Sequence, residues 1–177
     1  MDCIILGPTQ IEKISRYGQI VNLEEYLKEA GKFFAENFSK VIIIPDYGLP
    51  LLVAQQYKHY RPDGKVVGYI PEQTKGGKNL EEYFSFCDEI KGIGGGWFNL
   101  NTQLTKQSEN VFCLGFSAGV MIEICSIKYD QLYFKQNTKL YIDQRCISGK
   151  LMPEIENDIK NINYFKNFKE ANNKLIN

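Results

Sequence analysis

Histidine is almost absent from this 177-residue chain, which contains His59 alone, and its net charge is zero, with 21 basic and 21 acidic side chains. A zero net charge argues against a broad nucleic-acid surface, which needs clustered positive charge. No apolar run approaches the length that spans a bilayer. No basic flank or cleavage site of a secretory signal precedes the apolar run that begins at Cys3. We therefore expect a cytoplasmic protein with no nucleic-acid and no membrane partner.

Paired cysteines are missing as well. The five cysteines form no C-x-x-C pair, and their number is odd. Both facts argue against a zinc site or a disulfide framework. Cys3 and Cys113 stand inside apolar runs, where a free thiol behaves as a small hydrophobic group. The sequence therefore predicts buried free thiols and indicates neither a metal nor a cofactor.

What the chain does contain is an alternation of short apolar runs with amphipathic segments. A β-branched run such as Val41 to Ile44 is typical of a strand buried on both faces. Asn22, with Glu25 three residues later, predicts the start of a helix. The polar stretch Glu72 to Asn79 predicts a loop. The expected strands lie near 3–6, 41–44, 66–70, 89–93, 111–114 and 140–142, and the expected helices near 23–34, 51–57, 80–86, 100–106 and 120–127.

This alternation predicts an α/β fold, namely a single Rossmann-like domain over residues 1–150 with a parallel sheet of about six strands flanked by helices on both faces. Residues 151–177 predict a helical tail packed on the same domain. In such sheets a ligand binds outside the carboxyl ends of the strands. Four expected strand ends carry small residues that would let a ligand approach the backbone. They are Gly7 and Pro8, then Asp46 and Gly48, then Gly94, Gly95 and Gly96, and finally the segment 115–119.

The segment Gly115-Phe116-Ser117-Ala118-Gly119-Val120 joins an expected strand to an expected helix. Amides at a helix start attract anions, so we expect those of 117–120 to hold a phosphate group. Glu123 follows Gly119 by four residues and therefore shares its helix face. There its carboxylate would meet the ribose of a nucleotide. In the alternative interpretation Glu123 is a structural carboxylate with a partner inside the protein, because a lone acid in an apolar helix needs one.

This segment resembles the motif P-G-G-x-G-T-x-x-E of the SLOG superfamily of Rossmann-like proteins, which includes the LOG (lysine-decarboxylase-like) phosphoribohydrolases and the DprA-like proteins. Gly119 and Glu123 stand at a glycine and at the glutamate of that motif. The segments 66–72 and 100–111, the second of which contains Asn101, resemble the upstream motifs. The resemblance implies a homodimer, a nucleotide site and cleavage of the N-glycosidic bond of nucleoside 5′-monophosphates. The chain departs from the family at Leu100, where catalytic members have Arg, and at Val120, where the motif has Thr.

Two other hypotheses start from the same turn. It reads Gly-x-Ser-x-Gly, as in a nucleophile elbow, and resembles the turn of peptidase-E-like serine hydrolases, with Ser117 as the nucleophile. That reaction needs a histidine base. In the hydrolases with a nucleophile elbow and in the peptidase-E-like hydrolases this histidine follows the serine, whereas His59 precedes Ser117. The third hypothesis is a non-enzymatic ligand sensor or carrier that keeps the pocket without the chemistry. Trp97 and Phe98 are expected in the core, with stacking on a base as the alternative.

Overall fold

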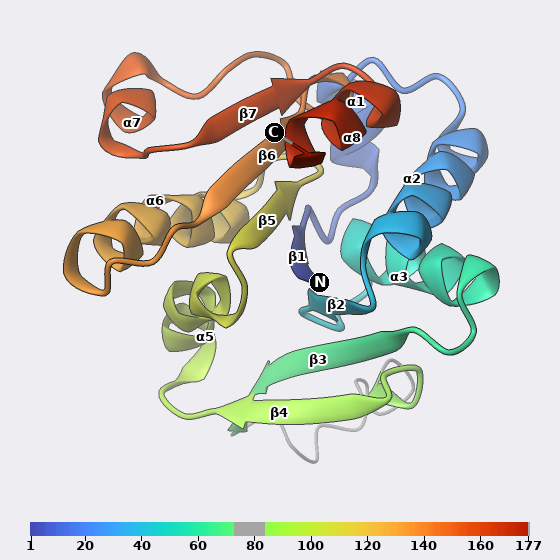
Figure 1. The fold of residues 1–177 in the computed structure, drawn as a ribbon, viewed down its shortest axis with the longest axis horizontal. Coiled ribbons are helices and arrows are strands. Elements are labelled where there is room, and N and C mark those ends of the chain that lie inside the picture. The colour runs from blue at the N-terminus through green and yellow to red at the C-terminus, as the bar shows by residue number, and fades with distance from the viewer. Residues whose placement is uncertain (73–83, 177) are drawn as a thin grey trace.

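The computed structural model describes residues 1–72 and 84–176. Within these ranges the chain forms one parallel β-sheet of seven strands with helices on both faces (Figure 1). The predicted α/β fold is therefore confirmed, with one strand more than expected. The loop predicted at 72–79 and the helix predicted at 80–86 lie for their larger part outside the described residues.

The bounds of the elements follow chain order. The strands are β1 (Asp2–Leu6), β2 (Lys40–Ile43), β3 (Lys65–Pro71), β4 (Glu89–Ile93), β5 (Asn110–Cys113), β6 (Lys139–Asp143) and β7 (Ile162–Phe165). The helices are α1 (Glu12–Tyr17), α2 (Leu23–Asn37), α3 (Leu49–Tyr60), α5 (Gly96–Leu104), α6 (Ala118–Tyr133), α7 (Pro153–Asp158) and α8 (Phe168–Ile176).

The strand order β4-β3-β2-β1-β5-β6-β7 places the reversal of the sheet beside β1. The chain runs outward from β1 through β2 and β3 to β4, and then returns to the other side of β1 with β5. In the register, Ile4 of β1 lies opposite both Ile42 of β2 and Val111 of β5. Such a reversal leaves a crevice at the carboxyl ends of the two strands, where ligands bind in folds of this type.

Three of the helices begin at residues that are typical of helix N-termini. The Asn22 side chain accepts a hydrogen bond from the Glu25 amide at 3.2 Å, so the predicted start of α2 is confirmed. Pro50 lies in the first turn of α3, where its missing N–H costs nothing. The Ser117 hydroxyl accepts from the Val120 amide at 3.3 Å and caps α6.

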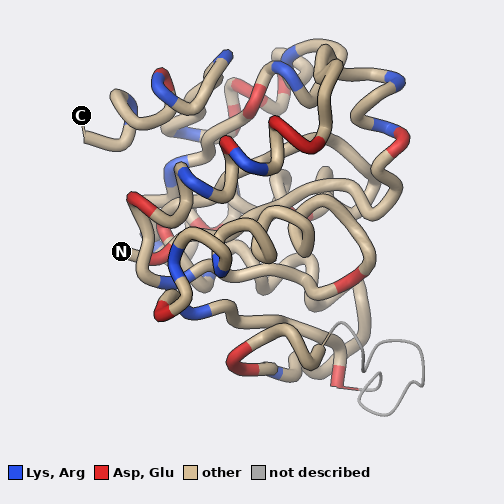
Figure 2. The backbone as a smooth tube through the Cα atoms, turned by 90° about the vertical axis from the view of Figure 1, so that its right-hand side faces the viewer, with Lys and Arg blue, Asp and Glu red and all other residues tan. Residues whose placement is uncertain are grey.

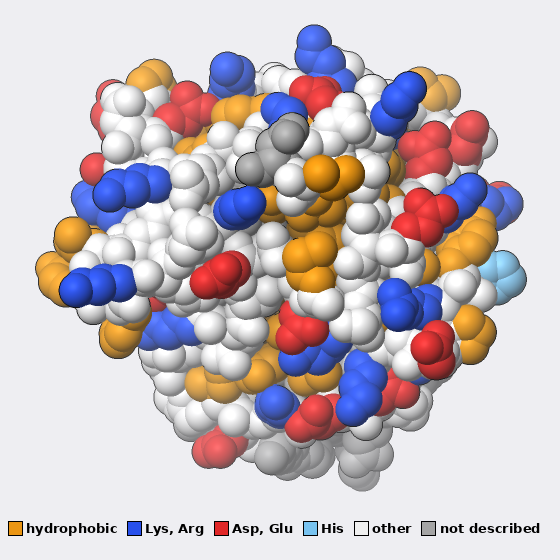
Figure 3. Space-filling view, viewed as in Figure 1, with side chains coloured by type: hydrophobic (Ala, Val, Ile, Leu, Met, Phe, Trp, Pro, Cys, Tyr) orange, Lys and Arg blue, Asp and Glu red, His pale blue; other side chains and the backbone are white. Residues whose placement is uncertain are grey.

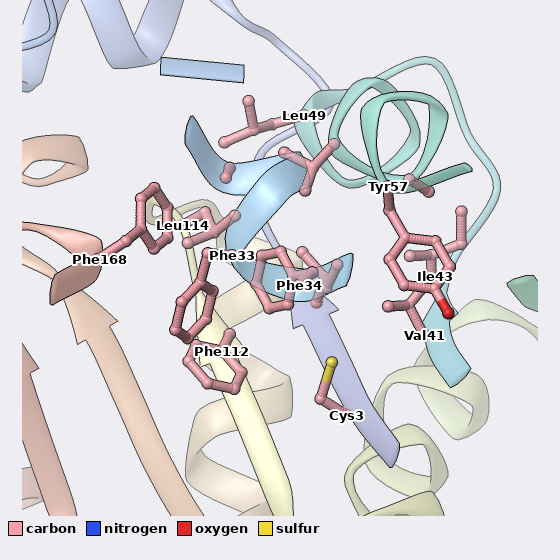
Figure 4. Packing of buried hydrophobic residues seen from close by; sticks show 14 of the residues in the cluster. Cys3, Phe33, Phe34, Val41, Ile43, Leu49, Tyr57, Phe112, Leu114 and Phe168 are labelled. Atoms are coloured by element: carbon pink, nitrogen blue, oxygen red, sulfur yellow. The ribbon is translucent and has the colours of Figure 1, made fainter. Parts of the chain in front are cut away.

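Two apolar layers hold the sheet between the helices. On one side α2 and α3 cover β1, β2 and β5, and Phe33 and Phe34 pack edge-on against Phe112, with ring centroids 5.6 and 5.1 Å away (Figure 4). On the other side α5 and α6 cover the sheet through residues such as Leu100 and Ile124, both fully buried. The reversal of the sheet is therefore rigidly supported on both faces.

Residues 151–177 add a strand that the sequence analysis does not predict. β7 pairs in parallel with β6, with Leu140 opposite Ile162, and α7 and α8 stand on either side of it in the sequence. The prediction of an entirely helical tail was wrong, because this four-residue strand sits among Asn and Lys residues and obtains its hydrogen bonds from β6. Helix α1 was also not predicted.

The surface carries both signs of charge in close mixture. Lys and Arg positions are interspersed with Asp and Glu positions along the backbone (Figure 2), and side chains of both signs are mixed over the face shown in Figure 3. Among the described helices none is long and apolar enough to cross a membrane.

Candidate functional site

A pocket of about 220 Å³ opens at the carboxyl end of β1, beside the start of α6. It therefore lies at the reversal of the sheet, where the fold leads us to expect a ligand. Its walls come from the end of β1, from the segments that follow β1 and β2, from the first turn of α3, and from α5 and α6. The predicted site residues that line it are Gly7, Asp46, Asn101, Ser117, Gly119, Val120 and Glu123.

The other predicted site residues lie outside this lining. Pro8 and Phe116 line a neighbouring cavity of about 230 Å³ together with Lys13 and Tyr17. Ala118 lies exposed in the first turn of α6.

The remaining glycines serve the backbone. At Gly48 a Cβ would lie 2.7 Å from the Thr9 Cα, so the absence of a side chain lets the segments after β1 and β2 touch. Gly115 has a φ of +128°, and its Cβ would lie 3.0 Å from Pro8 Cδ. Gly94, Gly95 and Gly96 turn the chain into α5, with positive φ at the last two.

The first turn of α6 forms one wall of the pocket. The Ser117 hydroxyl already accepts from the Val120 amide. The amides of Ala118 and Gly119 open the helix, where no earlier carbonyl of that helix can accept from them. A Cβ at Gly119 would meet no atom closer than 3.5 Å, so the backbone is open there. The Val120 amide is thus taken by Ser117, while the amides of Ala118 and Gly119 have no acceptor within the helix, and the predicted phosphate position at 117–120 stays a prediction.

Glu123 is the most unusual side chain of the pocket. It is only 4% exposed, and no hydrogen bond or ion pair reaches its carboxylate within residues 1–72 and 84–176. Burial, and then the negative charge of Asp46, raise the pKa of Glu123 to about 8. Near neutral pH this carboxyl group therefore holds a proton for most of the time. The alternative interpretation of Glu123 as a structurally paired carboxylate finds no partner in the described part of the chain.

Asp46 supplies a second carboxyl group from the segment between β2 and α3. Its Oδ2 accepts a hydrogen bond from the Thr9 hydroxyl at 2.7 Å. On balance the pKa of Asp46 is raised, because the effect of burial exceeds the opposing effect of the hydrogen bond from Thr9. Two carboxyl groups in different environments therefore face one cavity.

No Lys, Arg or His belongs to the described lining of the pocket. Arg145 donates to Asp143 at 2.9 Å and to Glu29 at 3.0 Å. Arg61 donates to the carbonyls of Ala35 and Phe38, next to the amino end of β2. Leu100, at the family's arginine position, is fully buried. The described residues thus contain no substitute for the arginine of the catalytic family members. They also contain no cluster of three or more His, Cys, Asp or Glu side chains that could hold a metal ion.

His59 does not serve Ser117 as a base. It lies in the last turn of α3, about 14 Å along the helix from Pro50, which lines the pocket from the first turn. The ring of His59 packs instead against Tyr60. Without a base the Ser117 hydroxyl is a poor nucleophile, and the helix cap is the role that its geometry shows.

Trp97 corrects the expectation of a core residue. It is 45% exposed and lines the pocket, and Phe98 is 69% exposed. Both belong to the first turn of α5, which begins four residues earlier than predicted. Thr9 also lines the pocket and was not among the predicted site residues, although it lies two residues after Gly7 and its hydroxyl donates to Asp46.

Fold and pocket together define a Rossmann-like α/β protein with a small-molecule-sized cavity at the reversal of its sheet. No family model matches the chain, and no curated protein matches it. Among solved structures it is similar to TM1055, a structural genomics target, with a TM-score of 0.70 and 17% identity over 99% of this chain and 98% of that one. It is also similar to the molybdenum cofactor carrier protein MCP from Chlamydomonas reinhardtii, with a TM-score of 0.60 and 14% identity over 99% of both chains. At these identities the likeness shows the fold alone.

Proposed function

We propose that this protein binds a nucleotide or a related phosphorylated small molecule in the pocket beside β1. The observation that carries the proposal is Glu123, which is buried, faces the cavity and lacks a partner among the described residues. The Glu123 carboxyl group lies at the wall of the cavity, where a ligand can bond to it directly. The pocket therefore favours an occupant with polar groups at that depth.

The arrangement of the walls supports a position for each part of such a ligand. A phosphate group fits the open amides of Ala118 and Gly119, where the helix dipole is favourable. Sugar hydroxyls fit the two carboxyl groups of Asp46 and Glu123, which accept and donate hydrogen bonds. A flat base fits against the half-exposed ring of Trp97.

Weak hydrolysis of nucleoside 5′-monophosphates is the activity that the SLOG resemblance adds to this proposal. The fold of the two structural neighbours is consistent with it, and Glu123 stands at the motif's glutamate. The experiment incubates the wild type and the Glu123→Ala variant with a panel of nucleoside monophosphates and measures the free base. Release by the wild type above the variant supports hydrolysis, and equal release by both rejects it.

A carrier or sensor role is the second candidate. It is favoured by the uncharged Leu100 at the family's arginine position and by the absence of a cation from the described lining. One structural neighbour is described as a cofactor carrier. A ligand that raises the melting temperature and is recovered intact after incubation supports this role. Unchanged melting across the nucleotide panel would contradict binding itself.

We further propose that the protein is cytoplasmic and forms a homodimer through α6. Cys125, Tyr129, Leu132 and Tyr133 follow one another along this helix, and all are exposed. The rings of Tyr129 and Tyr133 lie parallel at 6.2 Å, and the nearby Lys128 is paired with Asp158. An apolar stripe without free charge suits the centre of a self-complementary interface. Sedimentation equilibrium tests the proposal, and a monomer at high concentration would contradict it.

A further inference from the structure

Two carboxyl groups from different parts of the chain share the pocket beside β1. Asp46 follows β2, whereas Glu123 lies in the second turn of α6. Burial, and to a smaller extent the negative charge of Asp46, raise the pKa of Glu123. No lysine, arginine or histidine of the described lining offsets them. Two negative charges in such a cavity repel each other, and one proton removes the repulsion.

The surroundings of Asp46 stabilise an ionised carboxylate better than the surroundings of Glu123 do. Asp46 is half-buried, and the Thr9 hydroxyl donates to its Oδ2 at 2.7 Å, which stabilises the ionised form. Glu123 is almost fully buried and receives no such donor from the described residues. Within residues 1–72 and 84–176, the buried thiol of Cys113 also interacts with Glu123, and it offers no positive charge. The proton therefore belongs on Glu123.

We propose that Asp46 and Glu123 act as a carboxyl pair that carries one proton near neutral pH, with Glu123 donating to the ligand and Thr9-bound Asp46 accepting from it. This inference rests on the proposed function, because it needs a ligand in the same pocket. It narrows the ligand class to a sugar-bearing molecule that offers an acceptor atom to Glu123 and a hydroxyl to Asp46.

The pair also provides a general acid and a general base for N-glycosidic cleavage. Glu123 gives its proton to the departing nitrogen while the carbon–nitrogen bond breaks and its electrons leave with the base. A water oxygen bonds to the sugar carbon and loses a proton to Asp46. A proton then passes from Asp46 to solvent and from solvent to Glu123, which restores the starting state.

The first test needs no ligand. The side-chain carboxyl carbons of Glu and Asp are titrated by carbon-13 NMR in the wild type and in the Glu123→Gln, Asp46→Asn and Thr9→Val variants. One glutamate signal is expected to titrate far above the ordinary 4.5, to be lost in Glu123→Gln, and to fall by about one pH unit or more in Asp46→Asn. Thr9→Val is expected to raise the midpoint of one aspartate, Asp46, and to leave the Glu123 midpoint nearly unchanged, because Asp46 remains ionised over the range in which Glu123 titrates.

The proposal would be overturned if every glutamate signal of the wild type titrated near the ordinary pH of 4.5. It would also be overturned if a raised glutamate midpoint stayed at the same pH in Asp46→Asn. Circular dichroism checks the fold of each variant, and the mild Thr9→Val change keeps the test usable if a pocket variant unfolds.

The second test uses adenosine 5′-monophosphate at about pH 7 and about pH 9, a range above the phosphate's own titration near 6. The wild type is expected to lose about tenfold in affinity across this range, because Glu123 loses its proton and then repels the phosphate. The affinity of the Glu123→Gln variant is expected to change by less than about threefold between the two pH values, whatever its absolute affinity, because glutamine does not titrate. Loss of affinity in both proteins alike would contradict the pair. If the nucleotide fails to bind while the raised midpoint is present, the proposed ligand is wrong and the pair stands.

Discussion

Replacing Glu123 by glutamine is expected to remove a large pH dependence from the free energy of unfolding. The pKa of Glu123 is about 8 in the folded protein, against an ordinary 4.5. Because the folded pKa is raised, the contribution of Glu123 to stability is fully present below pH 4.5 and is lost as the pH rises to 8. At 1.36 kcal/mol per pH unit this gap corresponds to about 5 kcal/mol. That is as large as the entire stability of many domains.

The assay is urea unfolding of the wild type and Glu123→Gln at several values between about pH 5 and about pH 9. The free energy of unfolding of the wild type, relative to that of the variant, is expected to fall by about 4 kcal/mol over this range. The fall is about 1 kcal/mol smaller than the full effect of about 5 kcal/mol, because the loss of stability begins below about pH 5. Glu12→Gln, which removes one exposed carboxylate, is the matched control. If the curves of wild type and Glu123→Gln stay parallel to within about 1 kcal/mol, the buried carboxyl is not protonated and the reasoning fails.

Three further predictions concern the walls of the pocket and the exposed face of α6. Ser117→Ala removes the cap of α6 and is expected to lower the free energy of unfolding by about 1 kcal/mol, which chemical denaturation measures; an unchanged stability would contradict the cap. Gly48→Ala places a Cβ 2.7 Å from the Thr9 backbone and is expected to cost about 1–3 kcal/mol, whereas Gly119→Ala, with 3.5 Å of space, should cost clearly less; equal costs would contradict the packing argument. Tyr129→Glu puts a charge on the apolar stripe and is expected to shift sedimentation towards the monomer, while an unchanged dimer would place the interface elsewhere.

Most of the sheet could be predicted because its strands are strongly apolar. Runs such as Val41 to Ile44 carry their own signal, and the order of strands and helices dictates parallel pairing. The seventh strand carries no such signal, since Asn161 precedes it, Asn163 interrupts it, and only its pairing with β6 defines it. A pattern confined to four residues cannot reveal a partner that lies more than twenty residues away.

The position of the pocket could be predicted, but the part that each residue plays in it could not. Gly7 and Asp46 meet the start of α6 because the carboxyl ends of parallel strands lie at one edge. Gly48 and Gly115, however, make room for neighbouring backbone or proline rather than for a ligand, and the sequence does not distinguish the two uses of glycine. The placement of Trp97 depended on where α5 begins, which a glycine-rich stretch leaves undefined.

The pairing of β7 with β6 has a consequence for how the chain can be shortened. A protein that stops at residue 150 would leave the backbone of β6 as an open edge and would strip Phe165 and Phe168 from the aromatic cluster around Phe33. Open, apolar edges recruit other chains. Such a fragment is therefore expected to aggregate, so the last 27 residues belong to the folding unit as much as the first strand does.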